Sequence, residues 1–124
     1  LLGPAPVAPD GIEQGSAAQL HAARVEATWP AMGAEIEPGE TVPAELGVNS
    51  VAVSFTKGCY PGQELVERMD SRGATAPRLL QVVDVAEGTE PGAALQRDGA
   101  DIGTVTSVSG SRALAFVKRS ALAG

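Results

Sequence analysis

The 124-residue sequence is poor in the residues on which several large classes of protein depend. It contains one cysteine, which excludes an intrachain disulfide framework or a cysteine-only metal site and fits a reducing compartment such as the cytoplasm. Aromatic residues make up 3% of the chain, so the core must be built from Val, Leu, Ile and Ala. No apolar run is long enough to cross a membrane. Lys and Arg number 9 against 15 Asp and Glu, and the net charge of −6 argues against direct binding of nucleic acid.

Glycine and proline are abundant instead, and they mark the ends of the expected elements. Three prolines among residues 1–10 are incompatible with a regular helix. Asp10 and Glu13 then have the spacing of a capping box, and apolar residues follow at roughly the helical period, at Ile12, Leu20, Ala23 and Ala27. We therefore predict a helix over residues 10–28. Trp29-Pro30 ends it, because a residue before proline avoids the helical conformation.

The middle of the chain is expected to hold a loop, a strand and a second helix. Glycine and proline recur through residues 30–47 and predict an irregular segment. Residues 48–55 alternate in polarity, which predicts a strand with one face formed by Val51, Val53 and Phe55. Pro61 suits the first position of a helix. The apolar face of that helix would hold Leu65, Val66 and Met69, and the helix would end at residues 70–73.

After Pro77 the pattern becomes that of a β-protein. Short runs rich in strand-forming residues occupy 79–85, 94–96, 102–108 and 113–117. Turn residues separate them, and Asp98-Gly99 is a strong hairpin signal. We predict an α+β chain in which residues 1–74 form one domain portion and residues 75–124 form a small antiparallel β-barrel.

The segment Lys57–Glu64, with the sequence K-G-C-Y-P-G-Q-E, is the one that carries reactive chemistry. If Pro61 opens a helix, Cys59 lies just before the N-terminus of that helix, where unpaired amide groups favour a thiolate. Lys57 adds a positive charge two residues away. Cys59 is therefore either a reactive thiol or, as free cysteines often are, a small buried hydrophobic residue.

Residues of the first predicted helix offer a second candidate site. The only histidine, His21, has no evident third group to complete a Cys–His nucleophile or a metal centre, so we predict no metal site. Arg24 and Glu26 form a solvated face, or Glu26 accepts hydrogen bonds from a pair of N–H groups such as a pterin ring offers. Trp29 either covers the core or stacks on a ring.

Two motifs resemble those of a known family. Lys57–Glu64 followed by Arg68 resembles the K-G-C-[YF]-x-G-Q-E-x-x-x-R signature of YgfZ-type folate-binding proteins, which are related to the glycine-cleavage T-protein, an aminomethyltransferase. Arg24-Val25-Glu26-Ala27 with Pro30 and Gly33 resembles the R-[IL]-E-A-G-x-P-x-x-G segment of the same family. The resemblance covers nearly the whole chain. It implies the C-terminal portion of a T-protein-like folate-binding domain followed by the family's small barrel, with the N-terminal region of the same protein as a partner.

The resemblance implies binding of tetrahydrofolate and a role in the maintenance of iron–sulfur proteins, including enzymes that modify tRNA. By the same resemblance, Cys59 is the functional thiol, and the expected folate-site residues are Arg24, Glu26, Lys57, Tyr60, Gln63 and Arg68. The alternative is a folate-dependent aminomethyltransferase, although the catalytic aspartate of those enzymes lies in a region absent from this sequence. Two positions depart from the family pattern, because Thr28 replaces a glycine and Leu20 replaces a tryptophan that contacts folate in some members.

Overall fold

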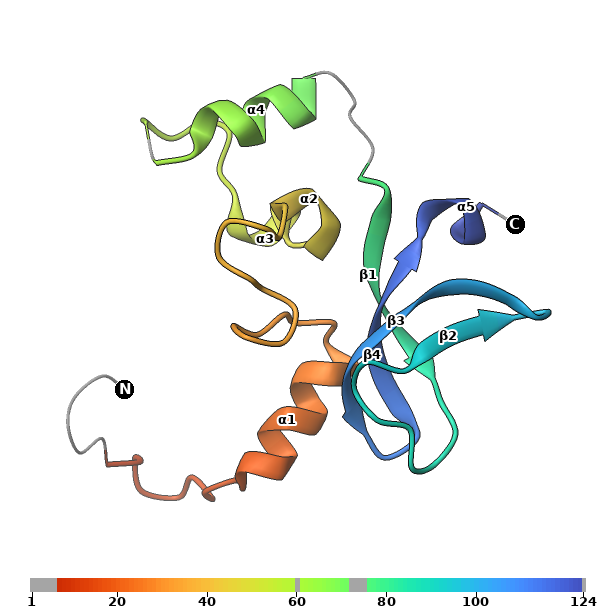
Figure 1. Cartoon of the computed structure of the whole chain (residues 1–124). Coiled ribbons are helices and arrows are strands. Elements are labelled where there is room, and N and C mark those ends of the chain that lie inside the picture. Colours follow the sequence, from red (N-terminus) through yellow and green to blue (C-terminus); the bar gives the residue numbers. More distant parts are fainter. Residues whose placement is uncertain (1–6, 60, 72–75, 124) are drawn as a thin grey trace.

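A four-stranded antiparallel sheet organises the chain. The computed structural model describes residues 7–59, 61–71 and 76–123. The strands follow the order β1-β4-β3-β2 across the sheet (Figure 1). Their bounds are Arg78–Asp84 for β1, Ala94–Arg97 for β2, Ala100–Ser109 for β3 and Arg112–Lys118 for β4. All four predicted strands are thus confirmed, and with them a small antiparallel β-sheet domain.

Short turns set the register of the sheet. Asp98 and Gly99 connect β2 to β3, with φ angles of 54° and 79°. Positive φ at both positions is the geometry of a type I′ turn, whose twist matches that of paired strands. Gly110-Ser111 connects β3 to β4, which makes Ser109 and Arg112 direct partners. The predicted hairpin at residues 98–99 is confirmed.

Five helices accompany the sheet in the part of the chain that the structure describes. Their bounds are Ala17–Glu26 for α1, Pro43–Leu46 for α2, Asn49–Ala52 for α3, Gln63–Ser71 for α4 and Arg119–Leu122 for α5. Figure 1 shows α1 beside one end of the sheet and α4 well apart from it, beyond α2 and α3. None of the helices is long and apolar enough to cross a membrane.

The first helix begins later than predicted. The capping box that forms is that of Ser16 and Gln19, whose side chains bond each other's backbone N–H at 3.1 and 2.8 Å. Asp10 lies in a turn instead, followed by Gly11 with a φ of 82°. The predicted apolar stripe is also wrong, because Leu20 is 74% exposed while Val25 is the buried residue of α1.

The predicted strand at residues 48–55 is wrong as well. Asn49–Ala52 form one helical turn, in which the N–H groups of Val51 and Ala52 donate to the carbonyl of Val48. A strand needs a neighbouring strand for its backbone groups, and the described sheet consists of the four later strands. Val51 is consequently 73% exposed rather than part of a core face.

The helix of the signature region is confirmed, but it starts two residues after Pro61. Gly62 has a φ of 81°, which no right-handed helix contains, so α4 begins at Gln63. Cys59 therefore lies further from the helix N-terminus than the sequence predicted.

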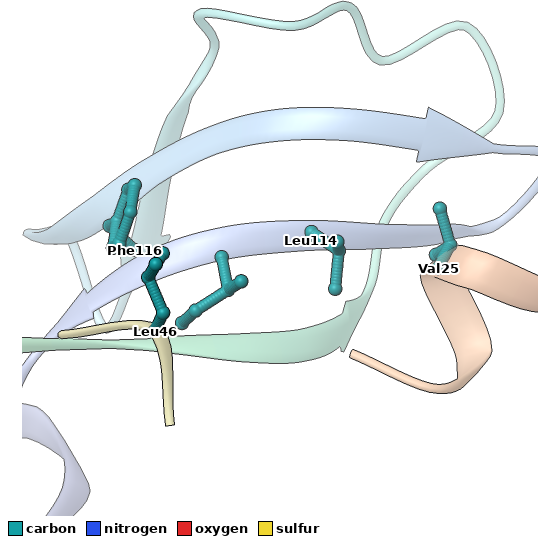
Figure 2. Packing of buried hydrophobic residues seen from close by; sticks show 5 residues of the cluster. Val25, Leu46, Leu114 and Phe116 are labelled. Carbon is teal, nitrogen blue, oxygen red and sulfur yellow. The ribbon is translucent and has the colours of Figure 1, made fainter. Parts of the chain in front are cut away.

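Both faces of the sheet are covered. On one face, Leu80, Leu114 and Phe116 pack with Val25 of α1 and Leu46 of α2. Figure 2 shows this row of side chains along β4, with Val25 and Leu46 approaching from the helices. On the other face Val105 and Val117 pack with Ala113 and Ala115, so the core is built from small aliphatic residues, as predicted.

Contacts from α2 reinforce the first cluster. Glu45, which is buried, accepts a hydrogen bond of 3.1 Å from Arg78 at the start of β1. The Arg78 guanidinium in turn lies 4.3 Å from the centroid of the Phe116 ring. Side chains from before and after residue 75 thus share one core. The boundary predicted near residues 72–78 falls largely outside the described residues.

Candidate functional site

A buried carboxylate lies between α1 and the sheet. Glu35, in the loop after α1, is 2% exposed. Its backbone N–H and that of Ile36 both donate to the carbonyl of Ala31, which forms a tight turn. This turn directs the Glu35 side chain toward β3, where a buried charge requires several hydrogen bonds to be tolerated.

An irregularity in β3 supplies two of those hydrogen bonds. The register against β4 shifts between Val105 and Ser107, so Thr106 is the extra residue of a β-bulge. The hydroxyl groups of Thr106 and Ser107 both donate to Oε1 of Glu35, at 2.7 and 2.6 Å. The bulge therefore brings two successive hydroxyls to the same oxygen atom.

Arg24 and a backbone amide satisfy the other oxygen. Oε2 of Glu35 accepts from Nη1 of Arg24 at 2.8 Å and from the N–H of Ala31 at 3.0 Å. Burial raises the pKa of Glu35. The hydrogen bonds from Ser107, Thr106 and Ala31, together with the charge of Arg24, outweigh that effect and hold the pKa below its ordinary value of 4.5.

Arg24 is engaged on every side. Besides Glu35, its guanidinium donates to the carbonyl of Trp29 at 3.0 Å and to the hydroxyl of Ser107 at 2.6 Å. It also lies 3.4 Å from Nδ1 of His21. Nε2 of His21 lies 2.9 Å from the carbonyl oxygen of Val108, which can only accept, so Nε2 carries the proton and Nδ1 accepts from Arg24. The contacts that Arg24 makes in the structure join α1 to the sheet. A contact between Arg24 and folate stays a prediction.

Glu26 lies on the opposite edge of the same helix and is exposed. Arg112, the first residue of β4, donates from Nε to Oε1 of Glu26 at 2.9 Å and from Nη2 to Oε2 at 3.3 Å. The remaining nitrogen, Nη1, donates to Oδ1 of Asp84 at 2.7 Å. The hydrogen bonds to Glu26 and to Asp84 raise the pKa of Arg112 further above its ordinary value, so the guanidinium stays charged.

A hollow of about 350 Å³ lies beside the C-terminal end of α1. Trp29, which is half-exposed, lines it together with Leu46, Val51 and Leu80. Thr28 also lines it and has a φ of 52°, an unusual conformation for a β-branched residue. Trp29 lies half-exposed beside the core residues Leu46 and Leu80, so covering the core and stacking on a ring both stay predictions for it.

The signature segment forms a separate, exposed surface. Cys59 is exposed, and it lines a shallow hollow with Gly62, Gln63 and Glu64. The amide of Gln63 donates to Glu67 one turn later, at 2.7 Å. The prediction that Cys59 is a small buried hydrophobic residue is therefore wrong. Tyr60 lies outside the described residues.

The two sets of predicted site residues are not brought together within this chain. Glu26 lies at the end of α1, whereas Gln63 begins α4, which packs against α2, and Cys59 lies in the segment before α4. Figure 1 shows α1 and α4 apart from each other. Lys57 and Arg68 both make interactions in the structure. Within the described ranges, no group of three His, Cys, Asp or Glu residues is arranged to hold a metal ion.

Sequence reasoning missed Glu35, Ser107 and Arg112. The two hydroxyl partners of Glu35 lie 71 and 72 residues away in the chain, and no local sequence pattern indicates such a pairing. Arg112 follows a Gly-Ser turn and looks like an ordinary polar strand end. A buried glutamate within a glycine- and proline-rich loop could have been suspected only by asking which charge compensates Arg24.

Comparison with known proteins agrees with the fold of the C-terminal sheet. Residues 78–124 match the family described as CAF17, C-terminal beta-barrel domain. An uncharacterized protein from Haemophilus influenzae is 35% identical over 92 residues, which are 68% of this chain and 32% of that protein. The mitochondrial iron–sulfur cluster assembly factor IBA57 of Homo sapiens is 35% identical over 89 residues, 67% of this chain and 25% of the relative.

A bacterial relative agrees with the resemblance noted at the motifs. The tRNA-modifying protein YgfZ of Serratia proteamaculans is 37% identical over 71 residues, 56% of this chain and 21% of the relative. The chain is a relative of YgfZ-type proteins. Its residues 78–124 carry a CAF17-type C-terminal barrel domain, and the chain spans a third or less of the length of these curated relatives.

Proposed function

We propose that this chain is part of a tetrahydrofolate-binding protein that supports iron–sulfur cluster assembly or repair and, through it, tRNA modification. The observation that carries the proposal is the exposed segment around Cys59, the residue that matches the thiol of the family's signature, which lies just before α4. The similarity to IBA57, an iron–sulfur cluster assembly factor, and to YgfZ, a tRNA-modifying protein, supports the iron–sulfur and tRNA parts of the proposal.

In this proposal residues 1–74 belong to the folate-binding domain and residues 75–124 form the barrel. Folate would be held through Glu26 and neighbouring residues, with the rest of the same protein completing the site. Iron–sulfur proteins would be the partners. A location in the cytoplasm stays a prediction, because the human relative is named as a mitochondrial protein.

Folate binding is tested on the full-length protein by titration with tetrahydrofolate. Glu26→Ala should weaken affinity by roughly tenfold or more, since a hydrogen bond to a charged group is worth about 1.5–3 kcal/mol. Glu37→Ala is the matched control, because Glu37 is an exposed glutamate in the loop after α1. Equal affinity of the Glu26→Ala and unaltered proteins would remove Glu26 from the site.

The role of the thiol is tested in cells that lack the protein. Complementation with Cys59→Ala should fail to restore the activity of iron–sulfur enzymes, while the purified variant should bind tetrahydrofolate as before. Restored activity would remove the thiol from the proposed role. Methylene transfer from an aminomethyl donor, measured on the unaltered protein, distinguishes the alternative: turnover would favour an aminomethyltransferase.

A further inference from the structure

We infer that Arg112 is the positioning residue for the carboxylate of Glu26, and that it holds this carboxylate ready for the paired N–H groups of a pterin ring. The inference rests on the proposed function. It adds a residue of the barrel, outside both family-like motifs, to the folate site.

A cation near Glu26 would stabilise its carboxylate at this position of the helix. Glu26 is the last residue of α1, where the partial negative charge of the helix terminus disfavours a carboxylate. Arg112 approaches from the β3–β4 hairpin and offsets this repulsion. The helix end and the hairpin are thereby joined through one ion pair.

A second carboxylate, that of Asp84, holds the Arg112 guanidinium in place beside Glu26. It is the direct cross-strand partner of Asp84 in the β1–β4 pairing, and Nη1 donates to Oδ1 of Asp84 at 2.7 Å. The guanidinium therefore lies between two carboxylates, with Nε and Nη2 left to face Glu26. Two parallel hydrogen bonds from a planar group set both the position and the plane of the Glu26 carboxylate.

The Glu26 carboxylate can accept further hydrogen bonds while it is paired with Arg112. A carboxylate has about four lone-pair sites, and Arg112 occupies one on each oxygen of Glu26. The Glu26 side chain is still 55% exposed, so the unused sites face outward. A pterin ring offers adjacent N–H donors, and a carboxylate already fixed in plane loses less side-chain freedom when it binds them.

Titration with tetrahydrofolate of the full-length protein tests the inference through Arg112→Gln, Arg112→Lys and Glu26→Ala. Arg112→Gln should weaken affinity roughly 5- to 20-fold, because the carboxylate must then be ordered on binding. Arg112→Lys keeps the charge but not the two-point contact, so it should recover only part of that loss. Lys118→Gln is the control, since it removes another exposed ion pair, with Asp101, from the same strand.

A double variant separates positioning from a merely structural effect. In the Glu26→Ala background, Arg112→Gln should cause no further loss of affinity, whereas a structural role would weaken binding in both backgrounds alike. Equal affinity of Arg112→Gln and unaltered proteins would overturn the inference alone. Absence of tetrahydrofolate binding by the unaltered protein would overturn the proposed function and the inference together.

Discussion

The hydroxyl of Ser107 donates to the Glu35 carboxylate at 2.6 Å, across 72 residues of sequence. This contact links the loop after α1 to the bulge of β3. The same hydroxyl accepts from Arg24 at 2.6 Å, so the three side chains form a closed set of hydrogen bonds. The family-like Arg24 motif therefore has a structural partner in the barrel.

Glu35→Gln should destabilise the protein by about 3 kcal/mol, because it leaves the largely buried charge of Arg24 without its partner. The measurement is the free energy of unfolding from chemical denaturation. Glu37→Gln, an identical change at an exposed position two residues away, should alter that free energy by less than about 0.5 kcal/mol. Equal stabilities of the two variants would mean that Arg24 does not depend on Glu35.

The same carboxylate predicts a pH dependence of stability. Its folded-state pKa lies below the ordinary value of 4.5, so its contribution is complete above that value and is lost as the pH falls through the folded-state pKa. The difference in unfolding free energy between the unaltered protein and Glu35→Gln should therefore be constant near neutral pH and shrink below pH 4.5. A difference that grew with acidification would contradict the assigned direction of the shift.

The strands could be predicted because their signals are local. Alternating side chains mark each strand, the turns at Asp98-Gly99 and Gly110-Ser111 mark the two hairpins without reference to distant residues, and all four strands agree with the structure. The core composition followed from the scarcity of aromatic residues, and Phe116 is the one aromatic residue in the first cluster.

The first part of the chain could not be predicted in the same way. The predicted capping box at Asp10 does not start a helix, and the one at Ser16, seen in the structure, starts a helix that places His21, Arg24 and Val25 against the sheet. That face is mostly polar, so a search for an apolar stripe selected exposed residues such as Leu20. Glu26 and Cys59 were predicted as site residues from family-like motifs, whereas the proposed role of Arg112 depends on a strand register that the sequence does not display.

Gly103→Ala should destabilise the protein by about 2–3 kcal/mol through a backbone collision. Gly103 lies in β3 between β2 and β4, and a Cβ atom there would overlap the carbonyl oxygen of Phe116. The sheet would have to separate at its most buried strand pair. Gly58→Ala is the control, because a Cβ at Gly58 meets no atom within 4 Å. Thermal unfolding of both variants measures the effect, and matching midpoints would show that β4 moves aside freely.

Thr28→Gly should stabilise the protein by about 0.5–1 kcal/mol. The N–H of Trp29 donates to the carbonyl of Arg24 and the N–H of Thr28 to that of Val25, which is the Schellman pattern at the end of α1. This pattern needs a left-handed residue, and Thr28 supplies it with a φ of 52° at a steric cost that glycine avoids. Ala27→Gly, one residue earlier with an ordinary helical φ of −78°, should destabilise instead, since glycine there only adds freedom to the unfolded chain. The two unfolding free energies should thus change in opposite directions, and a loss of stability in Thr28→Gly would mean that the side-chain contacts of Thr28 in the hollow outweigh its backbone strain.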